Sequence, residues 1–284
     1  MNIFDNLSNN FSSNIYHQGK SYTYSDLIAD VNCFNHLDDK KLVFIITTNS
    51  YDFLVGYVSF IRKKIPIALI NESMHPELFN NLLDRFKPSY VFSPKRSGCV
   101  KKNWNTIIEF NSYVLFETLN NYSYDIHDDL CLMIMTSGST GSPEFVKLSY
   151  SNIIANTNSI CKYLKIKKDD VAMTTMPPSY SYGVSIINSH LYKNSSIVIS
   201  DASIIDKDFW TNLDKYSVTT FGGVPFMFQM LKKLKFEKFH LKSLKYITQA
   251  GGKLDEETLK YFNVICQEKN IDFIVMYGQT EASP

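Results

Sequence analysis

The sequence lacks paired cysteines. Its 5 cysteines are scattered along the chain and none belongs to a CxxC pair, so neither a disulfide framework nor a zinc site of paired thiols is indicated. We interpret the cysteines as reduced thiols in a reducing compartment, with a catalytic thiol as the alternative. The 6 histidines are equally dispersed and show no spacing typical of metal ligands.

The sequence also lacks an excess of charge of one sign and a long hydrophobic run. Lys and Arg total 29 against 28 Asp and Glu, a balance that argues against nucleic-acid binding through general basic charge. The N-terminus has neither a basic start nor an apolar run, unlike a secretory signal. Residues 53–70 are apolar, but Arg62, Lys63 and Lys64 break the run, so it is too interrupted to span a bilayer. The sequence therefore predicts a cytoplasmic protein with no nucleic-acid and no membrane partner.

What the sequence does contain is an alternation of short β-rich runs and longer segments of helical period. Of its 284 residues, 44% are hydrophobic, enough for one large or two smaller domains. A strand leading into a helix is expected at residues 20–27, and a last strand leading into a polar loop at residues 271–284. Further strands are expected at residues 41–49, 65–71, 89–94, 130–138, 170–178, 195–200, 218–225 and 244–252, and helices at residues 51–64, 75–86, 151–166, 226–234 and 255–269. This alternation predicts an α/β fold of stacked βαβ modules, with mostly parallel sheets flanked by helices.

The polar stretch near residues 120–128 is typical of a linker. It divides the chain into a predicted first α/β subdomain, residues 1–124, and a second, residues 125–284. In the first part, Asn49 and Ser50 are placed to cap the helix that follows them. In the second part, Ser151 or Asn152 is expected near the N-cap of the helix at 151–166.

Three polar loops follow predicted strands: "TSGSTGSP" (136–143), "QAGG" (249–252) and "YGQTEAS" (277–283). Ligands of open α/β sheets lie at the carboxyl ends of the strands. Glycine lets the backbone come close to a ligand, and free N–H groups and hydroxyls suit phosphate oxygens. The first loop has neither the GxxxxGK[ST] spacing of a P-loop nor a GxSxG elbow. Taken alone, it is also consistent with a plain flexible turn.

Together, these loops resemble motifs of the adenylate-forming (AMP-binding) superfamily, which includes acyl-CoA synthetases, peptide-synthetase adenylation domains and firefly luciferase. "MTSGSTGSPEFVKLSYSN" (135–152) is similar to the phosphate-loop signature, "YGQTEAS" to the Y-G-x-T-E loop and "QAGGKL" to the adenine-side turn. "MPPSYSYG" (176–183) and "FGGVPFMFQML" (221–231) are similar to substrate-side segments. The resemblance covers nearly the whole chain.

The resemblance implies a reaction between a carboxylate and ATP. Carboxylate oxygen attacks the α-phosphorus, pyrophosphate leaves and an acyl-adenylate remains. A thiol then takes the acyl group, either from coenzyme A or from the phosphopantetheine of an acyl or peptidyl carrier protein. ATP and Mg²⁺ are the implied cofactors, and a small-molecule carboxylate is the implied substrate. The chemical demand is to manage charge on the polyphosphate, and no covalent enzyme nucleophile is needed.

The resemblance also implies roles for individual residues. Thr280 would contact the α-phosphate and Glu281 would hold Mg²⁺ as the metal ligand, so these two are the implied catalytic residues. Tyr277 would stack on adenine. The implied nucleotide-binding set is Thr136, Ser137, Gly138, Ser139, Thr140, Gly141, Lys147, Ala250, Gly251, Gly252, Tyr277 and Gly278. The implied substrate pocket consists of Tyr180, Tyr182, Gly183, Phe221, Gly222 and Gly223.

The sequence departs from the family at several positions. Glu144 replaces the lysine that follows the loop proline, and a carboxylate there repels triphosphate unless it turns away. Lys147 compensates only if the loop folds suitably. Tyr180 stands where a histidine is often found. Gly183 stands where amino-acid-activating members place an aspartate for the substrate ammonium, so we expect a fatty, aryl or hydroxy acid.

The chain ends at Pro284, one residue after the "YGQTEAS" loop. Family members continue with a ribose-binding aspartate and a mobile C-terminal domain that carries a catalytic lysine. We therefore expect an N-terminal domain, incomplete at its C-terminus and without the mobile domain, that binds nucleotide without forming adenylate on its own. The competing hypothesis is a degenerate or truncated relative that acts as a binding or scaffold protein.

Overall fold

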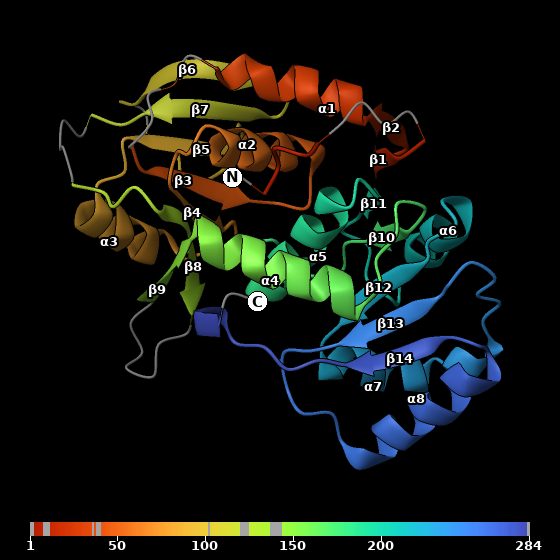
Figure 1. Ribbon diagram of the computed structural model, residues 1–284. Coiled ribbons are helices and arrows are strands. Elements are labelled where there is room, and N and C mark those ends of the chain that lie inside the picture. Colours follow the sequence, from red (N-terminus) through yellow and green to blue (C-terminus); the bar gives the residue numbers. More distant parts are fainter. Residues whose placement is uncertain are drawn as a thin grey trace.

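The computed structural model describes residues 3–7, 12–35, 37, 41–101, 103–119, 125–136 and 144–282. Within these residues the chain forms two seven-stranded sheets with helices between them and outside them (Figure 1). The predicted α/β fold with mostly parallel sheets is confirmed.

The first sheet, sheet A, has the strand order β14-β13-β12-β10-β11-β1-β2. Its strands are parallel except for β2, which returns antiparallel to β1. The parallel strands therefore end at one common edge. The strands of sheet A are β1 (Asn14–His17), β2 (Lys20–Thr23), β10 (Val171–Met173), β11 (Ser196–Ile199), β12 (Thr220–Gly223), β13 (Tyr246–Gln249) and β14 (Asp272–Val275).

The second sheet, sheet B, has the order β6-β7-β5-β3-β4-β8-β9. Its centre is parallel, and β7, β6 and β9 are antiparallel to their neighbours. The strands of sheet B are β3 (Val43–Thr47), β4 (Ile67–Asn71), β5 (Tyr90–Pro94), β6 (Asn105–Phe110), β7 (Tyr113–Glu117), β8 (Leu130–Thr136) and β9 (Glu144–Ser149).

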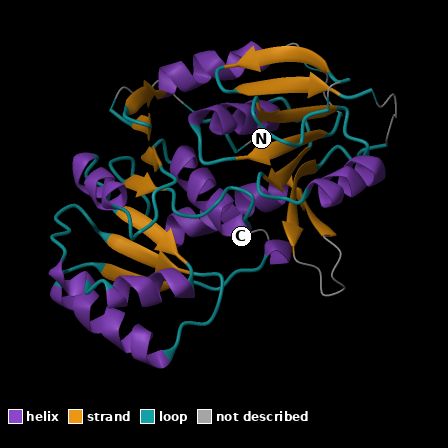
Figure 2. Ribbon diagram, turned by 180° about the vertical axis from the view of Figure 1, so that it is seen from behind, coloured by secondary structure: helices purple, strands orange, loops and turns teal. Residues whose placement is uncertain are grey.

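Helices cover both faces of each sheet (Figure 2). The α-helices are α1 (Tyr24–Val31), α2 (Tyr51–Arg62), α3 (Pro76–Phe86), α4 (Tyr150–Tyr163), α5 (Ser181–Tyr192), α6 (Lys207–Lys215), α7 (Pro225–Lys233) and α8 (Glu256–Glu268). The short 3-10 helices are η1 (Asn32–Phe34), η2 (Phe236–Lys238) and η3 (Thr280–Ala282).

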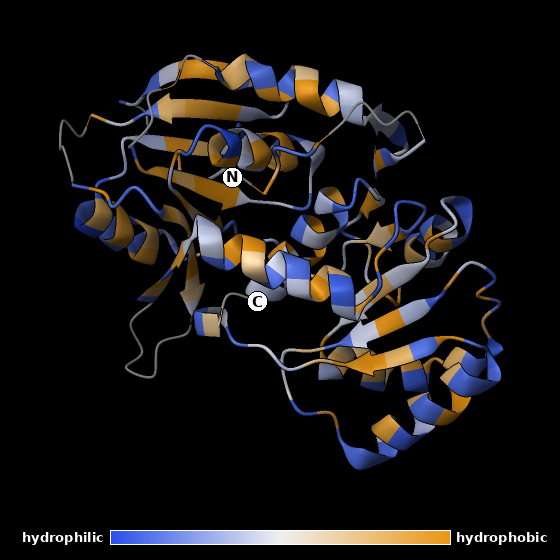
Figure 3. Cartoon of the chain, viewed as in Figure 1, coloured by the Kyte–Doolittle hydropathy of each residue, from blue (hydrophilic) through white to orange (hydrophobic). Residues whose placement is uncertain are grey.

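Three buried apolar clusters hold these layers together. The largest joins α1, α2, α4 and α5 to the facing sides of both sheets. A second packs α6, α7 and α8 on the other face of sheet A, and a third packs α3 on the other face of sheet B. The strands accordingly carry mostly hydrophobic residues, while the outer helices alternate polar and apolar faces (Figure 3). The order is helix, sheet, helix, sheet, helix.

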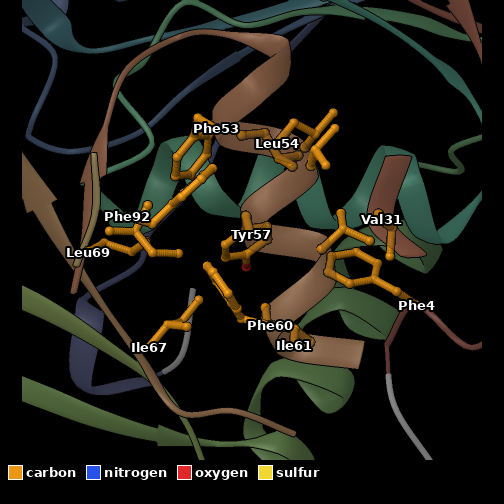
Figure 4. Close-up of a cluster of buried hydrophobic side chains, with 14 of the residues drawn as sticks. Phe4, Val31, Phe53, Leu54, Tyr57, Phe60, Ile61, Ile67, Leu69 and Phe92 are labelled. Atoms are coloured by element: carbon orange, nitrogen blue, oxygen red, sulfur yellow. The ribbon is translucent and has the colours of Figure 1, made fainter. Parts of the chain in front are cut away.

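Helix α2 lies in the middle layer, and all of its residues except Arg62 are buried, as expected for a helix between two sheets. Figure 4 shows Phe53, Tyr57 and Phe60 of α2 packed near Phe92 of β5. The predicted cap is confirmed at Ser50, whose side chain accepts a hydrogen bond from the Phe53 N–H at 3.1 Å. This cap fixes where α2 begins after β3.

Several elements were not predicted from the sequence. They are β1, β9, the helices α5 and α6, and the hairpin of β6 and β7, which extends sheet B. The cap of α4 is Ser149, with Asn152 completing a capping box, so Ser151 and Asn152 lie near the N-cap as predicted. The helix starts earlier because β9 carries the chain directly into it.

The two sheets exchange segments. Strands β1 and β2 come from the start of the chain but belong to sheet A, and β8 and β9 come after the expected linker but belong to sheet B. The sheets therefore do not follow the division at residues 124 and 125, which stays a prediction for the domains.

Candidate functional site

The carboxyl ends of β12, β13 and β14 meet the start of α5 and the end of the β8–β9 hairpin. The Thr280 hydroxyl donates to Ser181 Oγ at 3.3 Å, which ties η3 to the first residue of α5. Figure 1 shows η3 beside the lower ends of β8 and β9, and η3 contacts β9. Residues that are more than 100 positions apart in the sequence, such as Thr136 and Thr280, therefore border one site.

The turn after β13 requires glycine. Gly251 and Gly252 have φ angles of +77° and +155°, which L side chains rarely adopt. A Cβ on Gly251 would also lie 3.1 Å from Val224 Cγ1. The Ala250 N–H donates to the Gly223 carbonyl at 3.1 Å, so β12 and this turn are held side by side. The result is exposed backbone that a flat ligand can approach.

Gln249 holds this turn in place. It was not among the individual site residues predicted from the sequence. Its side chain is completely buried, and its amide nitrogen donates to the carbonyls of Ala250 at 3.1 Å and Gly252 at 2.9 Å. The signal available in the sequence was a polar residue at the last position of β13, directly before the turn that contains Gly251 and Gly252. A buried amide at that place holds the loop in shape.

Tyr277 presents an aromatic ring to solvent. Its exposure is 91%, and its hydroxyl is 3.5 Å from Gln279 Oε1. Gly278 follows it in the loop after β14. An exposed ring next to a glycine turn provides a surface on which a planar base can stack. The predicted adenine-side residues Ala250, Gly251, Gly252 and Tyr277 thus follow the two neighbouring parallel strands β13 and β14.

Glu281 is exposed on η3, next to Thr280. In the part of the chain that the structure describes, no group of three or more His, Cys, Asp or Glu side chains is placed to hold a metal ion. Mg²⁺ in nucleotide sites uses one or two carboxylates and completes its shell with phosphates and waters. A single exposed carboxylate therefore fits a magnesium ion that arrives with a polyphosphate.

The phosphate loop itself is described only at its flanks. Ser137, Gly138, Ser139, Thr140 and Gly141 lie outside the described residues. Thr136 ends β8 and is paired directly with Glu144 at the start of β9. Strands β8 and β9 therefore form an antiparallel hairpin. The pair of Thr136 and Glu144 marks the mouth of the phosphate loop, where the two strands enter it.

Lys147 lies away from this mouth. Side chains alternate along a strand, so Phe145 and Lys147 share one face of β9, while Glu144 and Val146 share the other. Phe145 packs with the α3 cluster, and Lys147 lines a cavity of about 550 Å³ together with Arg85. Lys147 therefore lies on the opposite face of β9 from Glu144, and its role in cofactor binding stays a prediction.

On the substrate side, Tyr182 crosses from α5 toward sheet A. Its hydroxyl donates to the Thr248 carbonyl at 2.9 Å and lies 2.7 Å from Thr248 Oγ1. Burial raises the pKa of Tyr182, so the hydroxyl stays protonated. Gly222 makes room for it, because a Cβ there would collide with the tyrosine hydroxyl. Gly183 is required for a similar reason, since a Cβ there would collide with the Pro177 carbonyl.

The remaining residues of the predicted substrate pocket lie in different environments. Tyr180 caps α5 and is 56% exposed, and Gly223 lies beside Ala250. Phe221 is buried on the other face of sheet A, where its ring meets Phe209 of α6 edge to face. Its side chain is part of the core, because odd and even positions of β12 face opposite sides.

The largest cavity described lies elsewhere, at the carboxyl ends of β3, β4 and β5. It has a volume of about 1000 Å³ and is bordered by Pro177 and Pro178. Asp52 in its wall accepts hydrogen bonds from Asn111 Nδ2 at 3.1 Å and from the Ser112 N–H at 2.9 Å. None of the residues predicted as a site lines this cavity.

No helix among the described residues combines the length and apolar character needed to cross a membrane. The sequence is similar to the medium-chain fatty-acid–CoA ligase of Escherichia coli (strain K12), with 25% identity over 55% of this chain and 27% of the ligase. It is also similar to the oxalate–CoA ligase of Saccharomyces cerevisiae, with 24% identity over 85% of this chain and 51% of that protein. The chain thus spans about half the length of these curated relatives, or less.

The fold is shared with the o-succinylbenzoate coenzyme A synthetase of Bacillus subtilis solved in complex with ATP and magnesium ion. The TM-score is 0.77 at 16% identity, over 99% of this chain and 60% of that one. The family described as AMP-binding enzyme matches residues 8–284 of the sequence. The chain therefore belongs to the AMP-binding enzyme family.

Proposed function

We propose that the chain forms the nucleotide- and acyl-binding part of an enzyme that activates a carboxylate with ATP. The family and its acyl-CoA ligase members support carboxylate adenylation at the level of the family. In this chain, the hydrogen bond between Thr280 and Ser181 is the observation that supports the proposal. It brings the loop after β14 to the start of α5.

Each residue has a specific task in this proposal. Tyr277 stacks on adenine while Gly251 and Gly252 let the base lie against bare backbone. The hydroxyls and N–H groups from Thr136 to Gly141 hold the phosphates, and Thr280 orients the α-phosphate toward the carboxylate. Glu281 is the ligand for Mg²⁺, which when bound neutralises charge on the polyphosphate. The chain's own contribution is therefore positioning and charge stabilisation.

The proposed acid carries no α-amino group. Gly183 offers no carboxylate to a substrate ammonium, and a side chain at that position would collide with the Pro177 carbonyl. The proposed acceptor of the acyl group is coenzyme A or a carrier phosphopantetheine. The proposed setting is the cytoplasm. For the 284 residues themselves, magnesium-dependent nucleotide binding is the property that we propose to measure.

The test is calorimetric titration of the chain with ATP, with and without Mg²⁺. We expect Mg²⁺ to tighten binding in the native chain and Glu281→Ala to remove that gain while binding of ATP alone persists. Glu268→Ala is the matched control, because Glu268 is also exposed and lies at the end of α8. No ATP binding by the native chain under either condition contradicts the proposal.

One observation favours a second function, that of a binding or scaffold protein without catalysis. Glu144 is paired with Thr136 at the mouth of the phosphate loop, where a negative charge opposes a triphosphate. If this function holds, ATP binding is absent in the native chain and Glu144→Lys does not restore it. If the carboxylate-activating function holds, the native chain binds ATP and Glu144→Lys strengthens that binding.

A further inference from the structure

The two edges of sheet A differ in charge. Strands β10 to β14 are parallel, so the five connections that enter them from a helix lie at one edge, the amino edge. These connections contain nine lysines and three carboxylates; they are residues 164–170, 193–195, 216–219, 234–245 and 269–271. The connections that leave the same strands, on the side of the candidate site, contain a single lysine. In Figure 1 the amino edge is at the right-hand end of β13, and η3 is on the opposite side.

The three carboxylates of the amino edge already have partners. Lys245 Nζ lies 3.1 Å from Asp169 Oδ2 and 2.7 Å from Asp170 Oδ1. Glu237 accepts a hydrogen bond from the Tyr261 hydroxyl. Between described residues, no ion pair involves the other lysines of this edge. Most of its positive charge is therefore uncompensated.

Helix ends explain only some of these lysines. Lys193 and Lys269 are the C-caps of α5 and α8. Lys165 and Lys235 each follow the C-cap of a helix. A positive charge at these four places favours the helix dipole. The other exposed lysines without an ion pair lie beyond the ends of the α-helices, and we call them the edge lysines: Lys167, Lys168, Lys238 and Lys242.

The connections that carry the edge lysines are fixed in place. The Lys245 ion pairs join the connection before β10 to the connection before β13. In the latter, the Phe239 carbonyl accepts a hydrogen bond from Lys269 Nζ at 2.9 Å, and the Phe239 ring stacks on Trp210 with 3.8 Å between the centroids. The edge lysines of both connections therefore belong to one continuous charged surface.

This surface suits a membrane better than a nucleic acid. The cavities of about 1000 and 550 Å³ are not lined by any edge lysine, so neither offers this edge a groove that could follow a nucleic-acid strand. Tyr163 is 65% exposed two residues before Lys165, and Phe239 is half-buried directly after Lys238. Aromatic rings close to lysines are typical of protein surfaces at the headgroup level of a bilayer.

We propose that the amino edge of sheet A docks on the surface of a membrane that contains anionic lipids. The edge lysines bind the headgroups through charge, and the chain lies on the membrane without inserting. The carboxyl edge, with the candidate nucleotide loops, then faces away from the lipid. The sequence-based expectation of no membrane partner rested on the charge balance of the whole chain, which conceals this edge.

The experiment is co-sedimentation of the 284-residue chain with lipid vesicles. One set of vesicles is phosphatidylcholine alone, and the other also contains phosphatidylserine. We expect at least about tenfold stronger binding to the vesicles with phosphatidylserine at low salt, because each lysine near an anionic surface contributes about fivefold. Raising the salt to about 1 M should remove the difference, since the Debye length falls to about 3 Å.

Variants locate the contact. The combined change of the four edge lysines to glutamine should weaken binding to the anionic vesicles at least about tenfold. The matched control changes four exposed lysines outside this edge and has the same net charge: Lys20→Gln, Lys64→Gln, Lys101→Gln and Lys207→Gln. The pairs Lys167 with Lys168 and Lys238 with Lys242 are also changed separately, so that a folding defect in the combined variant does not hide the result.

The outcomes are distinct from those for the proposed function. Equal binding to both kinds of vesicle overturns the docking proposal, as does an equal loss in the edge and control variants. Binding to mixed-sequence duplex DNA or RNA without binding to vesicles also overturns it and assigns the edge to nucleic acid. ATP affinity, measured by calorimetry, should be the same in the native chain and in both sets of variants. A chain that binds anionic vesicles but no ATP contradicts the proposed function alone.

Discussion

Both sheets end in polar residues at their carboxyl edges, but the two edges differ in what those residues bind. At the edge of sheet B, around the cavity of about 1000 Å³, the polar groups bind one another. Asp52 accepts from Asn111 and Ser112, and the Thr48 hydroxyl is 2.8 Å from the Tyr113 hydroxyl. This network joins β3, α2 and the β6–β7 turn.

At the edge of sheet A the corresponding groups are left open. Tyr277 is almost fully exposed, and the described residues provide no hydrogen-bond or ion-pair partner for Glu281. The backbone at Gly251 and Gly252 is bare and held in left-handed angles by the turn. The cavity of about 1000 Å³ thus lies at the edge where Asp52 and Thr48 already have partners, and the other edge keeps exposed groups for a ligand.

The difference teaches that cavity size alone does not locate a functional site. A buried polar group that has its partners stabilises the fold, and removing it costs stability. An exposed aromatic or carboxylate without partners contributes little to folding and is free to bind. Substitutions at the two edges should therefore have opposite consequences for stability and for binding.

The largest effect is expected for Asp52→Ala at the sheet B edge. The change leaves the Ser112 N–H and the Asn111 amide without their acceptor, at a cost of about 3 kcal/mol in the free energy of unfolding. Urea denaturation measures this loss, and calorimetry should show unchanged ATP affinity. Asp201→Ala is the control, because Asp201 is exposed in the same cavity. If the Asp52 variant is as stable as the native chain but no longer binds ATP, the roles of the two edges are reversed.

Tyr277→Ala tests the other edge. Removing a ring that is 91% exposed should leave the free energy of unfolding within about 0.5 kcal/mol of the native value. Binding of ATP should weaken by about 2 kcal/mol, because stacking on the base is lost. Tyr163→Ala, at another exposed tyrosine, should change neither quantity. A destabilised Tyr277 variant with native affinity would show that the ring serves the fold.

A smaller effect is expected at the mouth of the phosphate loop. Glu144→Lys replaces a repulsive charge by an attractive one and should tighten ATP binding about tenfold at low salt, with the gain shrinking as salt is added. Lys147→Gln should leave affinity unchanged, because its side chain lies on the opposite face of β9. A loss of affinity in the Lys147 variant would mean that the lysine reaches the triphosphate after all.

Much of the fold could be predicted from the sequence because the buried strands are unbroken apolar runs, as at Val43–Thr47, and their helices carry clear caps, as at Ser50. The α5 segment was harder to predict. Ser181–Tyr192 contains glycine, serine and asparagine among its apolar residues, so its composition resembles a loop. Only its burial between the two sheets makes it a stable helix.

The loops of the site could be predicted from the sequence, but the directions of their side chains could not. The sequence shows that Phe221 and Lys147 are close to the motifs, while the alternation of side chains on β12 and β9 turns Phe221 into the core and Lys147 to the opposite face from Glu144. Gln249 shows the reverse, since a buried amide is found only when the turn it supports is seen. In these cases the register of the strand, rather than the residue type, decides where the side chain lies.

The smallest effect is expected at the end of β9, a strand that was not predicted from the sequence. Because β9 runs to Ser149, the side chain of Ser149 accepts from the Asn152 N–H at 3.1 Å and caps α4. Ser149→Ala should lower the free energy of unfolding by about 1 kcal/mol, without changing ATP affinity, since the serine is bound by its own helix. Ser151→Ala, one residue inside the helix, should cost less than half as much. Equal losses in the two variants, measured by urea denaturation, would mean that the helix begins later than Tyr150 in solution and that Ser149 belongs with the open groups near the loop rather than with the satisfied ones.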